Sequence, residues 1–178
     1  LAPAAPGLLV DATVGLGGHS DALLRAAPGF RLLGVDRDPD AVAEARRRLD
    51  PHAHRATVVA ATFDRVPELL DELDLPAPAA VLADLGCSSL QLDTPERGFS
   101  FAADGPLDMR MDRSGASAAD LVNTADEEEL VTVFWRYGEE RRSRAVARAI
   151  VEHRHRRPIM TTGDLRRLVE RIIPVRRG

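Results

Sequence analysis

The stretch "LLVDATVGLGGHS", residues 8–20, joins an apolar, β-like run to a glycine-rich loop and the start of a helical pattern. A strand, a glycine loop and a helix in this order are typical of α/β folds that bind a nucleotide or a related ligand. Gly15, Gly17 and Gly18 let backbone N–H groups and the positive end of the helix approach a negatively charged group closely. The loop therefore predicts a ligand site whose occupant has to be identified.

Four apolar, β-like runs lie in the first hundred residues and alternate with helical patterns. This alternation predicts βαβ units and a parallel sheet, so the expected fold class is α/β. Asp38 and Pro39 fit the N-cap and the first position of the helix after the second run. The runs are residues 8–14, 31–36, 56–62 and 79–85.

After Asp93 the sequence changes character. Residues 94–117 are irregular and rich in Gly, Pro and Asp, which is typical of a functional loop or a passage between domains. The remainder predicts helices, and Leu130, Phe134 and Tyr137 share one helical face. Three pairs match the capping-box spacing: Ser117 with Asp120, Thr124 with Glu127, and Thr161 with Asp164.

The charge is distributed unevenly along the chain. Residues 1–130 carry 11 Arg against 23 Asp and Glu, whereas residues 131–178 carry 13 Arg against 5 acids. All 24 basic residues are Arg, which pairs with phosphates and stacks on bases. A basic segment on an acidic body suggests a polyanionic partner such as RNA. The alternative to an RNA partner is that the arginines form an ordinary solvated face. The absence of Lys would then reflect only the composition of the genome.

The composition indicates a folded, soluble protein. Hydrophobic residues make up 44% of the 178, enough to bury a sizeable core. The sequence has no apolar run of about 18 residues that could span a membrane, and its start lacks the features of a secretion signal. The single cysteine, Cys87, rules out an internal disulfide framework. We therefore expect a cytoplasmic location.

Asp36 narrows the choice of ligand. It ends the second run 21 residues after Gly15, where a doubly wound fold places an acid that accepts hydrogen bonds from ribose hydroxyls. The alternative to a ligand site is that Gly15–Gly18 form only a tight turn and that Asp36 caps a helix. A dinucleotide loop has a third glycine where this chain has Ser20, which disfavours NAD. S-adenosylmethionine (SAM) carries no phosphate, and its carboxylate needs only a few backbone donors.

Further residues suit a SAM site. Asp11 and Asp84 lie in the first and fourth runs and could supply negative charge near the sulfonium. Phe63 follows the third run and could lie against adenine, although an aromatic at that place also suits the core.

Five strings, taken together and in this order, closely resemble the MraW/RsmH family of SAM-dependent methyltransferases. They are "DATVGLGGHS" (11–20), "GVDRDPDA" (34–41), "ADLGCSSLQLDTPERGFSF" (83–101), "DGPLDMRMD" (104–112) and "WRYGEER" (135–141). The resemblance implies a Rossmann-like methyltransferase sheet with an inserted or appended small helical domain. It also implies methylation of the exocyclic N4 of a cytidine in the decoding region of small-subunit (16S) ribosomal RNA, within the small ribosomal subunit.

The family's cofactor contacts fall on matching positions of this chain. They are Gly17, Gly18, His19, Asp36, Phe63, Asp84 and Gln91. His19 and Gln91 come from the resemblance alone. It implies that residues 1–103 form the SAM-binding core and residues 104–178 a helical substrate-recognition domain.

The chain departs from the family pattern in three ways. Cys87 replaces an aliphatic residue, and we expect it to pack as a small hydrophobe and not to act as a nucleophile. The usual residues ahead of the first strand are missing, and the chain stops before the part that returns to the sheet. We therefore expect the C-terminal part of the sheet to lie outside this chain.

Candidate catalytic groups lie in the turn after the fourth run. Its acid, Asp84, and its hydroxyl, Ser88, could orient the cytosine amine. Phe99 or Phe101 could stack on a cytosine drawn out of the RNA, or both could anchor the loop.

Two further sets of basic residues are candidates for the substrate side. Arg110, held by Asp108, could contact a phosphate, while the neighbouring Met109 and Met111 could simply pack at the domain junction. A cluster in the helical part is the candidate RNA-docking surface: Arg141, Arg142, Arg144 and Arg148.

Two other classes of function compete with the methyltransferase. A non-catalytic RNA-binding or ribosome-assembly factor would keep the fold without binding SAM, and an NAD-dependent oxidoreductase would need a proton relay that the sequence does not offer. We expect no metal site, because the five His form no ligand cluster, and we place "HAH" (52–54) and "HRH" (153–155) on solvated turns or helix ends. The oligomeric state stays open.

Overall fold

The computed structural model describes residues 6–173, which form two compact units. One comprises residues up to Leu90 together with Met111–Arg113, and the other comprises Gln91–Arg110 and the residues from Ser114 onward. We refer to them as the sheet unit and the helical unit. The compact units thus divide at residues 90 and 91, whereas the functional boundary at residues 103 and 104 stays a prediction.

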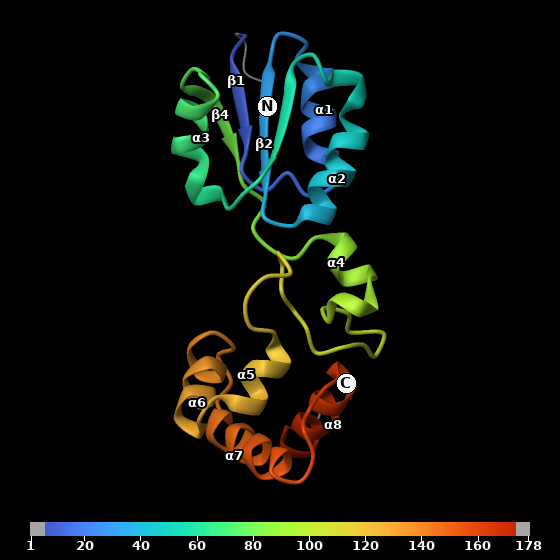
Figure 1. Cartoon of the computed structure of the whole chain (residues 1–178), viewed down its shortest axis with the longest axis vertical. Coiled ribbons are helices and arrows are strands. Elements are labelled where there is room, and N and C mark those ends of the chain that lie inside the picture. Colours follow the sequence, from blue (N-terminus) through green and yellow to red (C-terminus); the bar gives the residue numbers. More distant parts are fainter. Residues whose placement is uncertain (1–5, 174–178) are drawn as a thin grey trace. The chain divides into compact units, whose positions relative to one another are not determined.

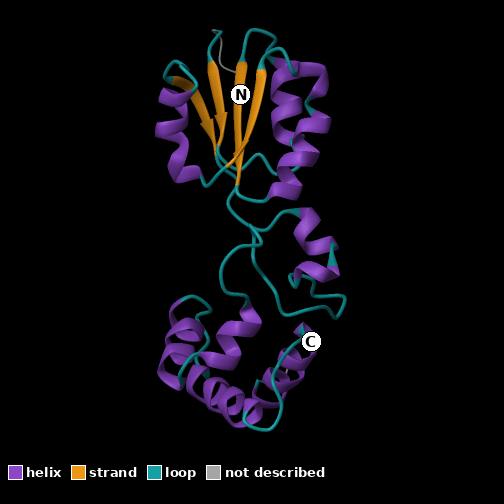
Figure 2. Cartoon of the chain, viewed as in Figure 1, coloured by secondary structure: helices purple, strands orange, loops and turns teal. Residues whose placement is uncertain are grey.

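The sheet unit is a parallel four-stranded sheet with the order β3-β2-β1-β4 (Figure 2). Its strands are β1 (Leu8–Asp11), β2 (Arg31–Asp36), β3 (Ala56–Ala60) and β4 (Pro78–Leu82). Its helices are α1 (Gly18–Ala26), α2 (Pro39–Arg48) and α3 (Val66–Glu72). The predicted α/β class with a parallel sheet is confirmed, although three of the four strands end earlier than predicted because the chain turns into the loops that carry candidate site residues.

Alternating side chains of the strands build two apolar layers. Leu9 and Leu32 pack in a buried cluster with residues of α1 and α2, whereas Leu8 and Leu33 pack in a second cluster with Leu69 of α3. This is the two-residue period of a strand buried on both faces. Helices α1 and α2 therefore cover one face of the sheet and α3 covers the other (Figure 1).

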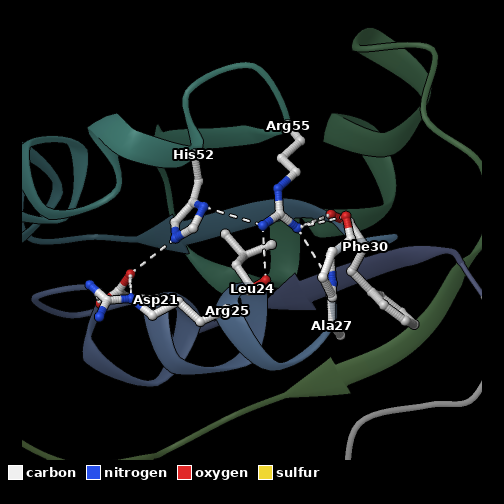
Figure 3. Close-up of polar contacts among 8 residues, drawn as sticks. Asp21, Leu24, Arg25, Ala27, Phe30, His52 and Arg55 are labelled. Carbon is white, nitrogen blue, oxygen red and sulfur yellow. Dashed lines mark hydrogen bonds and ion pairs between the residues drawn. The ribbon is translucent and has the colours of Figure 1, made fainter.

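One guanidinium fixes the C-terminal end of α1. Arg55 donates to four backbone carbonyls, among them Leu24 at 2.8 Å and Phe30 at 3.0 Å (Figure 3). Its Nη2 also lies 3.2 Å from Nδ1 of His52, whose Nε2 lies 3.1 Å from Asp21 Oδ1. A guanidinium can only donate, so neutral His52 accepts at Nδ1 and carries its proton on Nε2. His52 ends the short 3-10 helix Asp50–His52, as the prediction of a helix end allows, but its side chain is largely buried, while His54 is exposed.

The helical unit packs its helices around a core of its own. The helices are α5 (Ala118–Thr124), α6 (Glu127–Arg136), α7 (Ser143–Arg154) and α8 (Thr162–Ile172). The fully buried side chains include Leu130, Val146, Ile150 and Ile159. A short helix, α4 (Ser89–Asp93), lies where the chain leaves the sheet unit.

The start signals of these helices are only partly as predicted. Ser117 and Asp120 form a reciprocal capping box, and Thr161 accepts the backbone N–H of Asp164. The pairing of Thr124 with Glu127 was wrong, because Asp126 is the N-cap of α6 while Thr124 ends α5.

Segment 104–107 of the irregular stretch is tied to the start of α8. The carboxylate of Asp104 accepts the backbone N–H of Gly163 at 2.7 Å, and the N–H of Leu107 donates to the carbonyl of Met160 at 2.9 Å. The bond from Gly163 is the main reason why the pKa of Asp104 is lowered. Part of the long loop is thus fixed structure, which its composition did not indicate.

Candidate functional site

The glycine loop is built around three hydrogen bonds between distant parts of the sheet unit. The N–H of Val14 donates to the carbonyl of Val35 at 2.9 Å, and that of Gly15 donates to Asp36 Oδ2 at 2.9 Å. The N–H of Asp84 donates to Thr13 Oγ1 at 2.6 Å. The loop after β1 is therefore bonded to the ends of both neighbouring strands.

Gly17 is the position where the loop most needs a glycine. Its φ is +76°, in the left-handed region, and it is the N-cap residue of α1. A Cβ on Gly17 would lie 3.3 Å from the Cα of Ala45, so the loop also runs against the backbone of α2. Gly15 shares the positive φ, at +51°, but has no atom closer than 3.8 Å to such a Cβ.

The N-terminus of α1 has no side-chain cap. The first intrahelical bond runs from the N–H of Asp21 to the carbonyl of Gly17, at 2.9 Å. The preceding amides of Gly18, His19 and Ser20 come before that first bond, as in the first turn of any α-helix. Gly18 and His19 are exposed, so the helix offers donors at an accessible end.

Asp11 supports the loop from inside. It is 1% exposed, and its carboxylate accepts from Ser20 Oγ at 2.6 Å and from the N–H of Thr13 at 3.2 Å. Burial raises the pKa of Asp11, and the hydrogen bonds from Ser20 and Thr13 oppose that rise. Asp11 thus braces the loop, whereas Asp84 is exposed.

Asp36 uses both carboxylate oxygens on backbone amides. Oδ2 accepts from Gly15 and Oδ1 accepts from Asp38, each at 2.9 Å. Asp38 caps α2 with Pro39 in the first turn, as predicted. Each carboxylate oxygen can accept a second hydrogen bond, so the loop-closing role of Asp36 is compatible with a ribose contact.

Candidate residues from four strands meet along one edge of the sheet. Parallel strands end at the same edge, where open α/β sheets bind their ligands. The glycine loop follows β1, Asp36 ends β2, Phe63 lies three residues after β3, and Asp84 lies two residues after β4. The Phe63 ring is 58% exposed and is therefore not a core residue. Gln91 is buried and belongs to the helical unit.

The turn after β4 carries the candidate catalytic groups. Asp84 is exposed and Ser88 is partly buried. The expectation that Cys87 packs as a small hydrophobe was wrong, because the thiol is exposed in the loop that leaves the sheet.

The candidate substrate residues belong to the helical unit. Arg110 binds Asp108 with two parallel hydrogen bonds, Nε to Oδ1 at 3.0 Å and Nη2 to Oδ2 at 2.6 Å. These bonds are the main reason why the pKa of Asp108 is lowered. Phe99 is buried, whereas Phe101 is 93% exposed, so Phe101 is the ring that a base can reach.

Two ion pairs that the sequence analysis missed lie beside Asp36. Arg37 pairs with Asp112 at 2.7 Å, and Arg113 pairs with Asp40 at 2.5 Å. They hold the segment Met111–Arg113 on the sheet unit. The oppositely charged residues of these pairs stand in the strings "DRDPD" and "RMDR". Alternating charges of this kind are too common in proteins to predict a contact.

Within residues 6–173, no group of three or more His, Cys, Asp or Glu side chains is arranged to hold a metal ion. Over the same residues, no helix has both the length and the apolar character needed to cross a membrane.

Comparison with known proteins gives a consistent result. The model of a family described as the MraW methylase family matches residues 1–178. A Thermobifida fusca (strain YX) protein named ribosomal RNA small subunit methyltransferase H is 52% identical, over 98% of this chain and 54% of its own length. A protein of the same name from Methylobacterium sp. (strain 4-46) is 49% identical, over 97% of this chain and 51% of its own. The chain spans about half the length of these curated relatives.

Proposed function

This chain belongs to the MraW methylase family, and from that premise we propose that it acts as a SAM-dependent methyltransferase on small-subunit ribosomal RNA. The finer proposal is methylation of the exocyclic N4 of a cytidine in the decoding region of 16S RNA, in the cytoplasm and within the small subunit. The observation that carries it is the common edge of the sheet, where the glycine loop, Asp36, Phe63 and Asp84 follow four adjacent strands.

The groups at this edge fit the parts of SAM. The uncapped amides of Gly18 and His19 suit a carboxylate, because a helix N-terminus favours negative charge. The oxygens of Asp36 suit ribose hydroxyls, and the exposed Phe63 ring suits the flat face of adenine. The exposed carboxylate of Asp84 suits the positively charged sulfonium. We include Gln91, from the helical unit, on the strength of the family pattern.

When bound, SAM supplies an electrophilic methyl group. The cytosine amine is a weak nucleophile because its lone pair is delocalised into the ring, so positioning has to supply much of the rate. We propose that oxygen atoms of Asp84 and Ser88 accept hydrogen bonds from the two N–H groups of the amine. A proton has to leave as the C–N bond forms, and the Asp84 carboxylate is the candidate to receive it.

The helical unit supplies the candidate contacts to RNA. The exposed ring of Phe101 would stack on the displaced cytosine, and Phe99 would anchor the loop. The fixed geometry of Arg110 on Asp108 suits contact with a phosphate. On the wider surface, Arg141, Arg144 and Arg148 are exposed and suit the phosphate backbone, whereas Arg142 of the predicted cluster donates to the carbonyl of Ile172. We retain the division into a cofactor-binding domain, residues 1–103, and a substrate domain, residues 104–178, with Phe99 and Phe101 as residues of the first range that serve the RNA.

The test is mass mapping of cytidine methylation in small-subunit RNA from cells lacking this protein, followed by complementation. Loss of one N4-methylcytidine, restored by the unchanged protein but not by Asp84→Ala or Ser88→Ala, is the expected result. Asp50→Ala, an exposed acid outside the predicted set, is the matched control. A full methylation pattern in the deleted cells would refute the proposal. An RNA-binding protein with no measurable SAM affinity would favour the assembly-factor alternative.

A further inference from the structure

The only Trp and the only Tyr of this chain lie two residues apart, and both are exposed. Trp135 is 59% exposed and Tyr137 is 75% exposed, at the end of α6. Aromatic residues make up only 4% of the sequence, and large rings normally contribute to a core. The string "WRYGEER" thus contains two aromatic rings that do not pack in the core formed by residues 6–173.

The local structure explains why these rings are outside the core. On α6, Leu130 is buried and Phe134 packs beside it. The helix ends at Arg136 and Tyr137 is its C-cap, so the Tyr137 ring stays exposed and does not join Leu130 and Phe134 in the core. The chain then turns sharply, because the N–H of Glu140 donates to the carbonyl of Phe134 at 3.0 Å.

Arginines lie close to the two rings in the sequence and recur on the next helix. The guanidinium of Arg136 lies 5.9 Å from the centre of the Tyr137 ring. Arg144 and Arg148 are four residues apart on α7, so they share a face of that helix, and both are exposed. Arg148 is only 3.9 Å from Glu127, which offsets part of its charge.

Acidic groups of the same turn reduce this positive charge only in part. Residues 134–148 contain five Arg and two Glu, at 139 and 140. The carboxylate of Glu140 accepts the backbone N–H of Arg142 at 2.6 Å and is thereby held to the turn. The segment therefore keeps a net positive charge.

We propose that Trp135 and Tyr137, with the arginines of residues 136–144, form a stacking site for unpaired nucleotides of a single-stranded nucleic acid. Aromatic rings stack on any base, while arginines follow the phosphates. Within residues 134–148 no aliphatic side chain is among the exposed large hydrophobic residues, as an apolar protein interface or a lipid surface would require. The site belongs to the helical unit and would hold unpaired nucleotides of the RNA substrate.

The choice of RNA over DNA rests on the proposed function, whereas the stacking site itself does not. Loss of the stacking site would leave SAM binding by the sheet unit intact. Absence of SAM binding would refute the proposed function and leave the stacking site untouched. Isothermal titration with SAM, run in parallel on each variant, therefore separates the two failures.

Because Trp135 is the only Trp of the chain, its fluorescence reports directly on this site. The experiment titrates the 178-residue chain with a short single-stranded oligocytidylate, and separately with inorganic polyphosphate. Stacking predicts quenching by the oligonucleotide and little quenching by polyphosphate, which carries the charges without bases. Equal quenching by the two polymers would overturn the proposal.

Variants test the rings by a second method, the fluorescence anisotropy of a dye-labelled oligocytidylate. We expect Trp135→Leu and Tyr137→Leu each to weaken binding about tenfold, the usual loss for one stacked base. Trp135→Phe keeps a ring and should retain most of the affinity. Met160→Ala, which removes another exposed apolar side chain of the helical unit, is the matched control and should change nothing. Far-UV circular dichroism checks that each variant is folded.

Two results would overturn the stacking site. One is unchanged oligocytidylate affinity in Trp135→Leu and Tyr137→Leu. The other is burial of Trp135 by self-association, seen as a concentration-dependent shift of its emission without RNA, since a second copy would then occupy the surface.

Discussion

The carboxylate of Asp36 accepts the backbone N–H of Gly15 at 2.9 Å, across 21 residues of sequence. This bond joins the end of β2 to the glycine loop after β1. The same carboxylate accepts the N–H of Asp38 at the start of α2. Asp36 therefore holds the loop in shape, in addition to any contact that it makes with a ribose.

The variant Asp36→Asn should lose both functions in part. An amide retains one acceptor and turns an NH2 group toward the other backbone N–H, which leaves a donor unsatisfied. We expect SAM affinity to fall about tenfold or more and the free energy of unfolding to fall by about 1–3 kcal/mol. Calorimetric titration and urea unfolding measure the two effects. Asp50→Asn is the control, and equal behaviour of the two variants would contradict this role.

Gly17 and Gly15 form a matched pair for testing the close approach of the loop to α2. Both have positive φ, but only Gly17 would place a Cβ 3.3 Å from the Cα of Ala45. We expect Gly15→Ala to cost about 1 kcal/mol of unfolding free energy from backbone strain, and Gly17→Ala to cost about 2 kcal/mol or more. Urea unfolding followed by circular dichroism measures both. Equal losses would show that the contact with α2 contributes nothing.

Asp11 should give the sheet unit a distinctive dependence on pH. Its pKa is raised by burial, so between the ordinary value and the raised value the folded state binds more protons than the unfolded state. This contribution to stability is therefore lost as the pH rises through that window. Asp11→Asn removes the charge and keeps a partner for Thr13 and Ser20, because the Ser20 hydroxyl can also accept.

The check is the difference in unfolding free energy between the unchanged chain and Asp11→Asn, from about pH 3 to about pH 7. Relative to the variant, the unchanged chain should become less stable as the pH rises. A constant difference, or one of opposite slope, would show that the burial of Asp11 does not have this effect.

Arg55 should matter more for stability than an exposed arginine that forms an ion pair. Its guanidinium satisfies the carbonyls of Leu24, Ala27, Pro28 and Phe30 at the C-terminal end of α1 (Figure 3). We expect Arg55→Met to cost about 2–4 kcal/mol, because it leaves several carbonyls without their donor. Arg65→Met breaks an exposed pair with Glu72 and should cost at most about 1 kcal/mol. Similar losses in urea unfolding would contradict this ranking.

The sequence predicted the parts of the fold that depend on local pattern. Apolar runs with helices between them indicated the parallel sheet, and Asp38 with Pro39 indicated the start of α2. The position of Asp36 relative to Gly15 indicated that the two lie close together, as their hydrogen bond shows. In each case a short motif determines its own backbone geometry or follows directly from parallel strand order.

Contacts between distant segments could not be predicted from local pattern. Nothing near Asp104 indicates that it accepts the N–H of Gly163 in the first turn of α8, and nothing near Arg55 indicates that it binds the C-terminal end of α1. The exposure of Tyr137 was not foreseen, because helical periodicity does not show where a helix ends. Cys87 was misplaced because the preference of a residue type for the core says nothing about one loop.

The most direct test of the central claim is a ¹H–¹⁵N NMR titration of this chain with SAM. The claim predicts shifts for the amides of Gly17, Gly18 and His19 and for those next to Asp36, Phe63 and Asp84. The amides of Gly29 and Ala53, in turns that precede β2 and β3 at the opposite edge of the sheet, should not move. The absence of any shift, or shifts confined to other residues, would contradict the claim that this edge is the cofactor site.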